Sequence, residues 1–258
     1  MTPQDERDRQ NRILDAAERK YAARYRSVMD GASQRMIAEY MRTGSAPQMP
    51  DDFERRLADA FLAVAGDMMG AFGVHEMKSA PPLEKKSWAE FFQQLAIEYL
   101  QEEAIRRRIV GITETTRRLI INLIVIGQDQ GEGVDQIGRR LTDVMPAMTS
   151  YRANLIARTE THGAANYGAW RTSQAIGTRR TREWISTEDA RTRDFGEADA
   201  EVDEFNHRVM NGRREDGNGL FQVPHKNGGT EALRFPGDPN ASPGNTINCR
   251  CAVAYVRR

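Results

Sequence analysis

Cysteine is almost absent from this chain of 258 residues: there are only two, Cys249 and Cys251, in the segment NTINCRCAVA near the C-terminus. A disulfide between residues spaced Cys-x-Cys would be strained, which argues against a secreted fold built on disulfides. A chain of this length buries enough apolar surface to fold without such cross-links. We therefore expect synthesis in a reducing cytosol and a structure whose stability does not require the cysteines.

Long apolar runs are absent as well. The strongest one, LIINLIVIG over residues 119–127, is too short to span a bilayer. The first residues, MTPQDERDRQ, are charged rather than apolar. We expect neither export by a signal peptide nor insertion into a membrane.

The chain also lacks an excess of charge, since 37 lysine and arginine residues balance 37 aspartate and glutamate residues. A neutral molecule is not, as a whole, an electrostatic trap for nucleic acid. Arginine dominates the local basic clusters EAIRRRIV, GTRRTREW and NGRRED, and its planar fork suits bidentate contacts. A solvated helical face is the commoner role of such clusters, so the sequence leaves open a weak contact with DNA at most.

Helical patterns fill the first 146 residues. In the segment 12–29 the side chains of Leu14, Ala17, Tyr21, Tyr25 and Met29 recur every three or four residues, which predicts one apolar stripe of an amphipathic helix. Further on, the sequence predicts helices capped by Ser87 and by Thr113, and a short helix within residues 131–145. We expect a helical bundle or an extended helical arm over residues 1–146.

The sequence changes character after Pro146. Residues 149–177 form a helical pattern rich in alanine and glycine, which lets other backbones approach closely, with Gly177 as its expected C-cap. Short β-branched or apolar runs follow, separated by turn residues. The predicted fold class is therefore α+β: a helical N-terminal half, then a small α+β module over residues 147–258 in which a long helix packs on a short antiparallel sheet.

Four short motifs follow one another in this second half: IARTET on the long helix, WISTEDARTRD, NHRVMNG, and LRFPGDPNASPGNTINCRC. In this order and spacing, residues 115–256 resemble the phage Mu F-like family of minor head proteins, related to the SPP1 gp7-type head morphogenesis proteins. The chain departs from the family pattern by the stretch FGEADAEVDEF ahead of its histidine. The residues that carry the resemblance are Arg158, Glu160, Asp189, Arg191, Arg193, His207, Pro236, Asp238, Asn248, Cys249 and Cys251.

Arg158 and Glu160 lie on one helix but are not three or four residues apart, so we expect them to contact different partners. Arg158 is expected to pair with Asp189 or another carboxylate of the sheet. A structural ion pair is favoured over catalysis, because no activated nucleophile or general base accompanies these residues.

Two loops have the chemistry of rigid turns. In STEDARTRD, the side chains of Ser186, Thr187 and Asp189 can accept hydrogen bonds from backbone amides, and Arg191 and Arg193 can fork onto carboxylates or phosphates. In FPGDPNASPGN, proline, glycine, Asp238 and Asn240 together predict a fixed irregular loop before the last strand. The glycines of this loop do not form a nucleotide-binding fingerprint.

The paired cysteines allow two interpretations. On one face of a strand, Cys249 and Cys251 could give two thiolates to a zinc ion, with His207 and His225 as candidate partners. Alternatively they are two small buried side chains where the last strand packs on the long helix. The spacing departs from the common Cys-x₂₋₄-Cys pattern, which favours burial, so the sequence predicts no metal and no cofactor.

The resemblance implies a minor head protein of a tailed bacteriophage or prophage, not an enzyme, bound to the portal inside the capsid and acting in head morphogenesis and in DNA packaging or delivery. It implies a location in the virion, and in the host cytoplasm during assembly. We expect the helical half to engage the portal, and the major capsid or scaffolding protein stays open as a further partner. The alternative is a phage-encoded nucleotide-handling enzyme or toxin, which would need a pocket formed by Arg158, Glu160 and Asp189.

Overall fold

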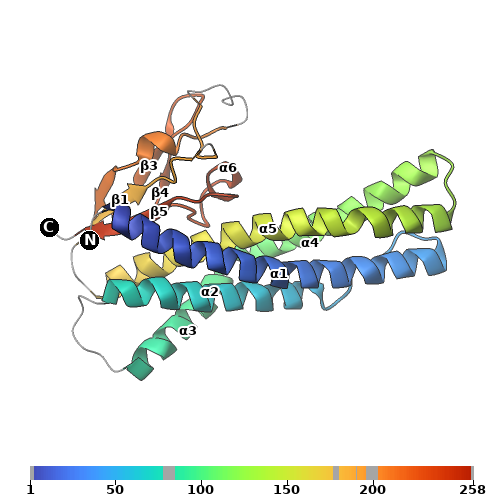
Figure 1. Ribbon diagram of the computed structural model, residues 1–258, viewed down its shortest axis with the longest axis horizontal. Helices are drawn as coiled ribbons and strands as arrows, with labels where there is room; N and C mark the ends of the chain where they lie inside the picture. Colours follow the sequence, from blue (N-terminus) through green and yellow to red (C-terminus); the bar gives the residue numbers. More distant parts are fainter. Residues whose placement is uncertain (1–2, 78–84, 177–179, 190, 196–202, 257–258) are drawn as a thin grey trace.

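The computed structural model describes residues 3–77, 85–176, 180–189, 191–195 and 203–256. Within them, long helices form an elongated bundle, and the strands gather beside one end of it, next to the start of α1 (Figure 1). The elements are α1 (Pro3–Thr43), α2 (Phe53–Met77), α3 (Lys85–Gln101), α4 (Glu103–Asp129), α5 (Val134–Ala175), β1 (Thr181–Ile185), η1 (Arg208–Met210), β2 (Arg214–Asp216), β3 (Phe221–Pro224), β4 (Thr230–Leu233), α6 (Pro243–Thr246) and β5 (Ala252–Val256).

The predicted apolar stripe of the first helix is confirmed. Leu14, Ala17, Tyr21, Tyr25 and Met29 are all buried in the main core, which α1 shares with α2, α3, α5 and the start of α4. A helix with such a stripe is stabilised mainly by packing of that face. The chain leaves the helix at Gly44, whose positive φ of 66° suits glycine and whose N–H donates to the carbonyl of Tyr40.

The predicted helix starts are wrong in three places. Ser87 lies inside α3, which begins at Lys85. Thr113 lies inside α4, where its hydroxyl donates to the carbonyl of Ile109 instead of capping a helix end. The helices expected before and after Pro146 are one helix, α5, and Gly177 lies outside the described residues.

Pro146 does not end α5 because the helix is held by its neighbours on both sides of the proline. Leu141 and Met145 are buried in a second core cluster with Tyr40 of α1, and Ala153 is buried in the main core. Packing of this kind outweighs the loss of one backbone hydrogen bond. The division of the chain at residue 146 remains a prediction, and α5 crosses that position without a break.

The small residues of α5 allow close contacts, as predicted. A Cβ atom at Gly168 would lie 2.6 Å from the Cα of Met69 in α2, so the two helix backbones touch there. A Cβ atom at Gly163 would lie 3.3 Å from the carbonyl oxygen of Gly237, in the Pro-Gly-Asp-Pro turn. The helix therefore approaches both another helix and a loop of the α+β module through glycine.

We expect Gly168→Val to lower the free energy of unfolding by about 1–3 kcal/mol, because α5 and α2 must move apart to admit the side chain. Gly111→Ala is the matched control, since a Cβ atom at Gly111 of α4 meets nothing within 4 Å. It should raise stability by about 0.5–1 kcal/mol through helix propensity. Urea unfolding followed by circular dichroism measures both, and equal effects at the two glycines would contradict the close approach.

Helix α2 is long and apolar enough, by length and composition alone, to cross a membrane over Phe53–His75. Half of its most apolar stretch is buried inside the structure. Phe53, Leu57, Phe61 and Met69 belong to the main core shared with α1 and α5. In this structure the apolar character of α2 therefore serves packing between helices.

The sheet is antiparallel, as the α+β class predicts. β1 lies between β2 and β5, and β3 pairs with β4 as a separate hairpin. Arg182 of β1 is buried and donates to the backbone carbonyls of Arg234 and Gly219, which ties the sheet to the hairpin. The core of this module consists of Trp184, Phe205, Met210, Phe221, Val223, Leu233, Cys249 and Cys251.

Candidate functional site

The family-like residues lie along the seam where α5 meets the loops of the α+β module. Arg158 on α5 donates from Nη1 to Oδ1 of Asn248 (2.7 Å), just ahead of the cysteines. Asn248 has a positive φ of 62°, and its own N–H donates to the hydroxyl of Thr159 (2.9 Å). The turn that leads into the Cys-x-Cys segment is thus fixed to the helix.

The pairing predicted between Arg158 and Asp189 is wrong. The carboxylate partner of Arg158 is Glu18 of α1, with Nε and Oε2 3.1 Å apart. The other oxygen of Glu18 lies 3.0 Å from Nε2 of His162, which is buried on α5. The long helix α1 brings Glu18 alongside α5 over a sequence separation of 140 residues, which no local pattern predicts.

Burial acts to raise the pKa of Glu18, but the hydrogen bond from His162 and the charge of Arg158 outweigh it and lower the pKa. A carboxylate with a lowered pKa contributes stability above its unfolded-state value, near 4.5, and loses that contribution as the pH falls through its folded-state value. Glu18→Gln should therefore reduce stability at neutral pH and flatten its loss in acid. Urea unfolding at about pH 6 and about pH 3 tests this, with Glu114→Gln on the exposed face of α4 as the control.

Glu160 is only 2% exposed, and its Oε1 accepts from Nη1 of Arg108 in α4 at 2.8 Å. Tyr25 and Tyr99 both have a pKa well above the ordinary value for tyrosine. Burial is the main cause, and the charge of Glu160 is the second. Arg158 and Glu160 thus have different partners, as their spacing predicts. The arrangement is a buried ion pair between α4 and α5.

The STEDARTRD loop is held both by its own groups and by neighbouring segments of the module. Asp189 accepts from the backbone N–H of Arg191 (3.0 Å) and from the guanidinium groups of Arg191 (3.2 Å) and Arg250 (2.6 Å). Burial acts to raise the pKa of Asp189, but these donors lower it overall. Ser186 instead donates to the carbonyl of His207, and Arg193 donates to the carbonyl of Ile247. Both arginines are engaged within the fold.

The Pro-Gly-Asp-Pro turn is held from inside, as predicted for a fixed loop. Asp238 accepts from the backbone N–H of Arg234 (3.0 Å) and of Asn240 (3.1 Å), and also from the Arg234 guanidinium. Gly237 has a positive φ of 73°. The carbonyl of Pro236 accepts a hydrogen bond from Asn166 (2.9 Å).

Asn166 of α5 is a residue that the sequence reasoning missed. Its Nδ2 donates to the carbonyls of Pro236 (2.9 Å) and Cys251 (3.1 Å), and its Oδ1 accepts from the N–H of Val253 (3.2 Å). One buried amide therefore joins the turn, the cysteine segment and β5 to the helix. The only signal in the sequence is an asparagine among the small residues of GAANYGAW.

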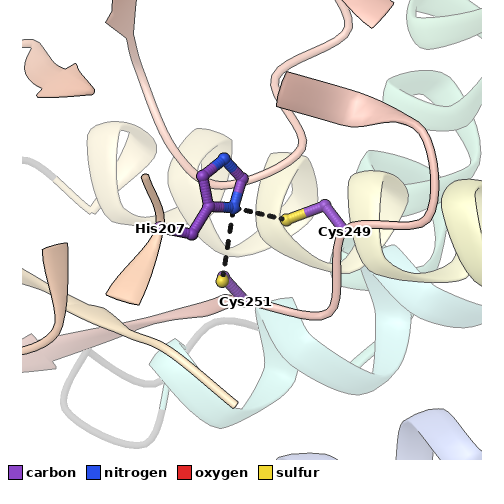
Figure 2. Close-up of side chains that lie close together, drawn as sticks. All are labelled: His207, Cys249 and Cys251. Atoms are coloured by element: carbon purple, nitrogen blue, oxygen red, sulfur yellow. Dashed lines mark hydrogen bonds between the residues drawn. The ribbon is translucent and has the colours of Figure 1, made fainter. Parts of the chain in front are cut away.

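His207 and the two cysteines meet inside the α+β module (Figure 2). Nδ1 of His207 lies 3.6 Å from the sulfur of Cys249 and 3.6 Å from that of Cys251, and all three side chains are at most 3% exposed. The cysteines precede β5 instead of lying within it, and both sulfurs point toward Nδ1 of His207. His225 is elsewhere: its ring packs on Phe205 and its Nδ1 accepts from the N–H of Asn227.

The environment distinguishes the two thiols. A hydrogen bond from Cys251, and the interaction with His207, lower the pKa of Cys249 against the effect of burial. The pKa of Cys251 is raised by that hydrogen bond to Cys249 and by burial. Within the described residues, His207, Cys249 and Cys251 are the group of histidine, cysteine and acidic side chains that could hold a metal ion.

The three residues required for the enzymatic alternative do not come together. Arg158 pairs with Glu18, Glu160 with Arg108, and Asp189 with Arg191 and Arg250. The buried thiols and His207 form no open nucleophile and base pair of the kind catalysis needs, since each of the three is almost inaccessible to solvent.

Comparison with known proteins identifies a family for this chain. No curated protein and no solved structure matches the chain. The family described as phage Mu protein F like protein matches residues 120–254. The match begins within α4, contains α5 and the signature residues, and ends in β5. Since it covers more than half of the chain, the chain belongs to the phage Mu protein F-like family, whose members point to phage head morphogenesis and to a structural rather than an enzymatic role.

Proposed function

We propose that the protein is a minor head protein of a tailed bacteriophage or prophage that binds the portal inside the capsid, in few copies, and acts in DNA packaging or delivery. Family membership is the observation that supports this proposal. The long helical bundle suits a docking arm, because it extends well beyond the α+β module (Figure 1). The arm would contact the portal, and the module would face the DNA path.

Exposed apolar side chains at the far end of the arm support this orientation. Met41 lies near the end of α1, and Val125 and Ile126 lie near the end of α4. They are 44%, 45% and 47% exposed. Exposed apolar side chains contribute to protein interfaces when a partner covers them.

The test is co-purification of the full chain with the portal protein of the same phage or prophage, with the ratio determined by native mass spectrometry. A stable complex with few copies per portal ring supports the proposal. A folded chain that binds no portal would contradict it. A chain shortened by residues 1–110 is unsuitable, because the removal of α1 to α3 would strip α5 of its main packing partners.

Surface variants separate the arm from the module. Val125→Glu with Ile126→Glu should abolish the complex and leave the fold intact, because both side chains are nearly half exposed. Val209→Glu is the matched control in the module, where Val209 is 48% exposed. If only Val209→Glu abolishes the complex, the module and not the arm binds the portal.

A further inference from the structure

We propose that His207, Cys249 and Cys251 bind one zinc ion, which ties the Cys-x-Cys segment to the start of η1. The cysteines alone favour plain burial, but the fold adds a histidine 42 residues upstream of Cys249. The proposal is independent of portal binding. It assigns a zinc ion to these three buried residues, which have no role in the proposed head-assembly function.

The spacing of the three ligand atoms fits zinc. In tetrahedral coordination, a sulfur at about 2.3 Å and a nitrogen at about 2.0–2.1 Å from the ion lie about 3.6 Å apart. Both sulfur to Nδ1 distances are 3.6 Å, and all three ligand atoms lie within 4.8 Å of one another. The ion would therefore fit between the side chains with little movement of the backbone.

The protonation of His207 also fits. Glu231 can only accept hydrogen bonds, so the amide nitrogen of Asn245, 2.5 Å from its Oε2, must face that carboxylate. Oδ1 of Asn245 then faces Nε2 of His207 at 2.7 Å, so Nε2 carries the proton. Nδ1 is left with its lone pair directed at the two sulfurs. A ligating histidine is characteristically oriented in this way by a hydrogen bond from its other nitrogen.

Without a metal, the cluster holds two thiols and one imidazole acceptor. A single lone pair on Nδ1 faces two sulfurs, and it can accept a proton from only one of them at a time. Zinc would replace both thiol protons, which pass to solvent, and would be bound by two thiolates and a neutral imidazole. Sulfur and imidazole ligands favour zinc over calcium or magnesium.

The site would be structural. Within the described residues no fourth histidine, cysteine or acidic side chain joins the cluster, so we assign the fourth position to a water molecule. The three ligands are 1–3% exposed, which leaves no path for a substrate. Trp184 packs edge-on against the His207 ring, with ring centres 5.3 Å apart, and would shield one side of the ion.

The test uses the full chain, purified without a polyhistidine tag, and measures bound zinc by elemental mass spectrometry. We expect one zinc per chain, lost in His207→Ala and in Cys249→Ser. His225→Ala is the matched control and should keep its zinc, because His225 contacts Phe205 and lies outside the cluster. Retention by His207→Ala with loss in His225→Ala would overturn the assignment.

If the variants do not fold, a second measurement tests zinc binding with the native chain. The native chain is stripped with a chelator and titrated with zinc. We expect uptake of one equivalent, a rise in Tm of more than about 5 °C, and an X-ray absorption spectrum with two sulfur ligands. No uptake by a folded stripped chain, or coordination by oxygen and nitrogen alone, would refute the proposal.

Discussion

Arg108→Met is expected to destabilise the protein by about 3–5 kcal/mol, because it leaves the carboxylate of Glu160 buried without its cation. The side chains of Arg108 and Glu160 are 18% and 3% exposed, and Nη1 of Arg108 lies 2.8 Å from Oε1 of Glu160. The second oxygen of Glu160 is buried and makes no hydrogen bond within the described part of the chain. Solvent therefore has little access to that oxygen. Urea unfolding measures the change.

The neighbouring arginine provides the control. Arg107 pairs with Glu103 on the surface of α4, where the two side chains are 72% and 81% exposed. Arg107→Met should change stability by less than about 0.5 kcal/mol, since exposed ion pairs contribute little. A similar effect of the two substitutions would contradict the role given to the buried pair.

A double variant separates charge from packing. Adding Glu160→Gln to Arg108→Met removes the unpaired charge, so the double variant should be more stable than Arg108→Met by at least about 1 kcal/mol. If the two effects simply add, the cost of Arg108→Met arises from lost packing and the electrostatic explanation is wrong.

Asn166→Ala is expected to cost about 2–5 kcal/mol and to loosen the attachment of β5 to α5. The substitution leaves the N–H of Val253 and the carbonyls of Pro236 and Cys251 without the partner they have in the native chain. A buried polar group that loses its partner costs about 1–3 kcal/mol. Asn166 is 3% exposed, so water has little access to these groups.

Hydrogen exchange gives a local readout for this variant. The amide of Val253 should exchange much faster in Asn166→Ala, while the amides in the middle of α1 should change only as far as global stability falls. Asn227→Ala, at an exposed asparagine of the hairpin loop, should change stability by less than about 0.5 kcal/mol. Unchanged protection of Val253 would show that Asn166 does not hold β5.

The sequence by itself determined the class of the fold and much of its helical half. The three-and-four spacing from Leu14 to Met29 is a local property, and these side chains are buried as predicted. The small residues of α5 likewise predict close approach, which Gly168 and Gly163 provide. The order of four motifs was sufficient to identify the family, because that order is written in the chain itself.

Tertiary structure decided where the helices end and which residues form the site. α5 runs through Pro146 because buried contacts on both sides outweigh a local breaker, and no local rule contains those contacts. Glu18 instead of Asp189 pairs with Arg158, since α1 lies along α5. The choice of His207 over His225 as the neighbour of the cysteines depends on how η1 and the segment before β5 pack, and sequence spacing carries no information about that packing.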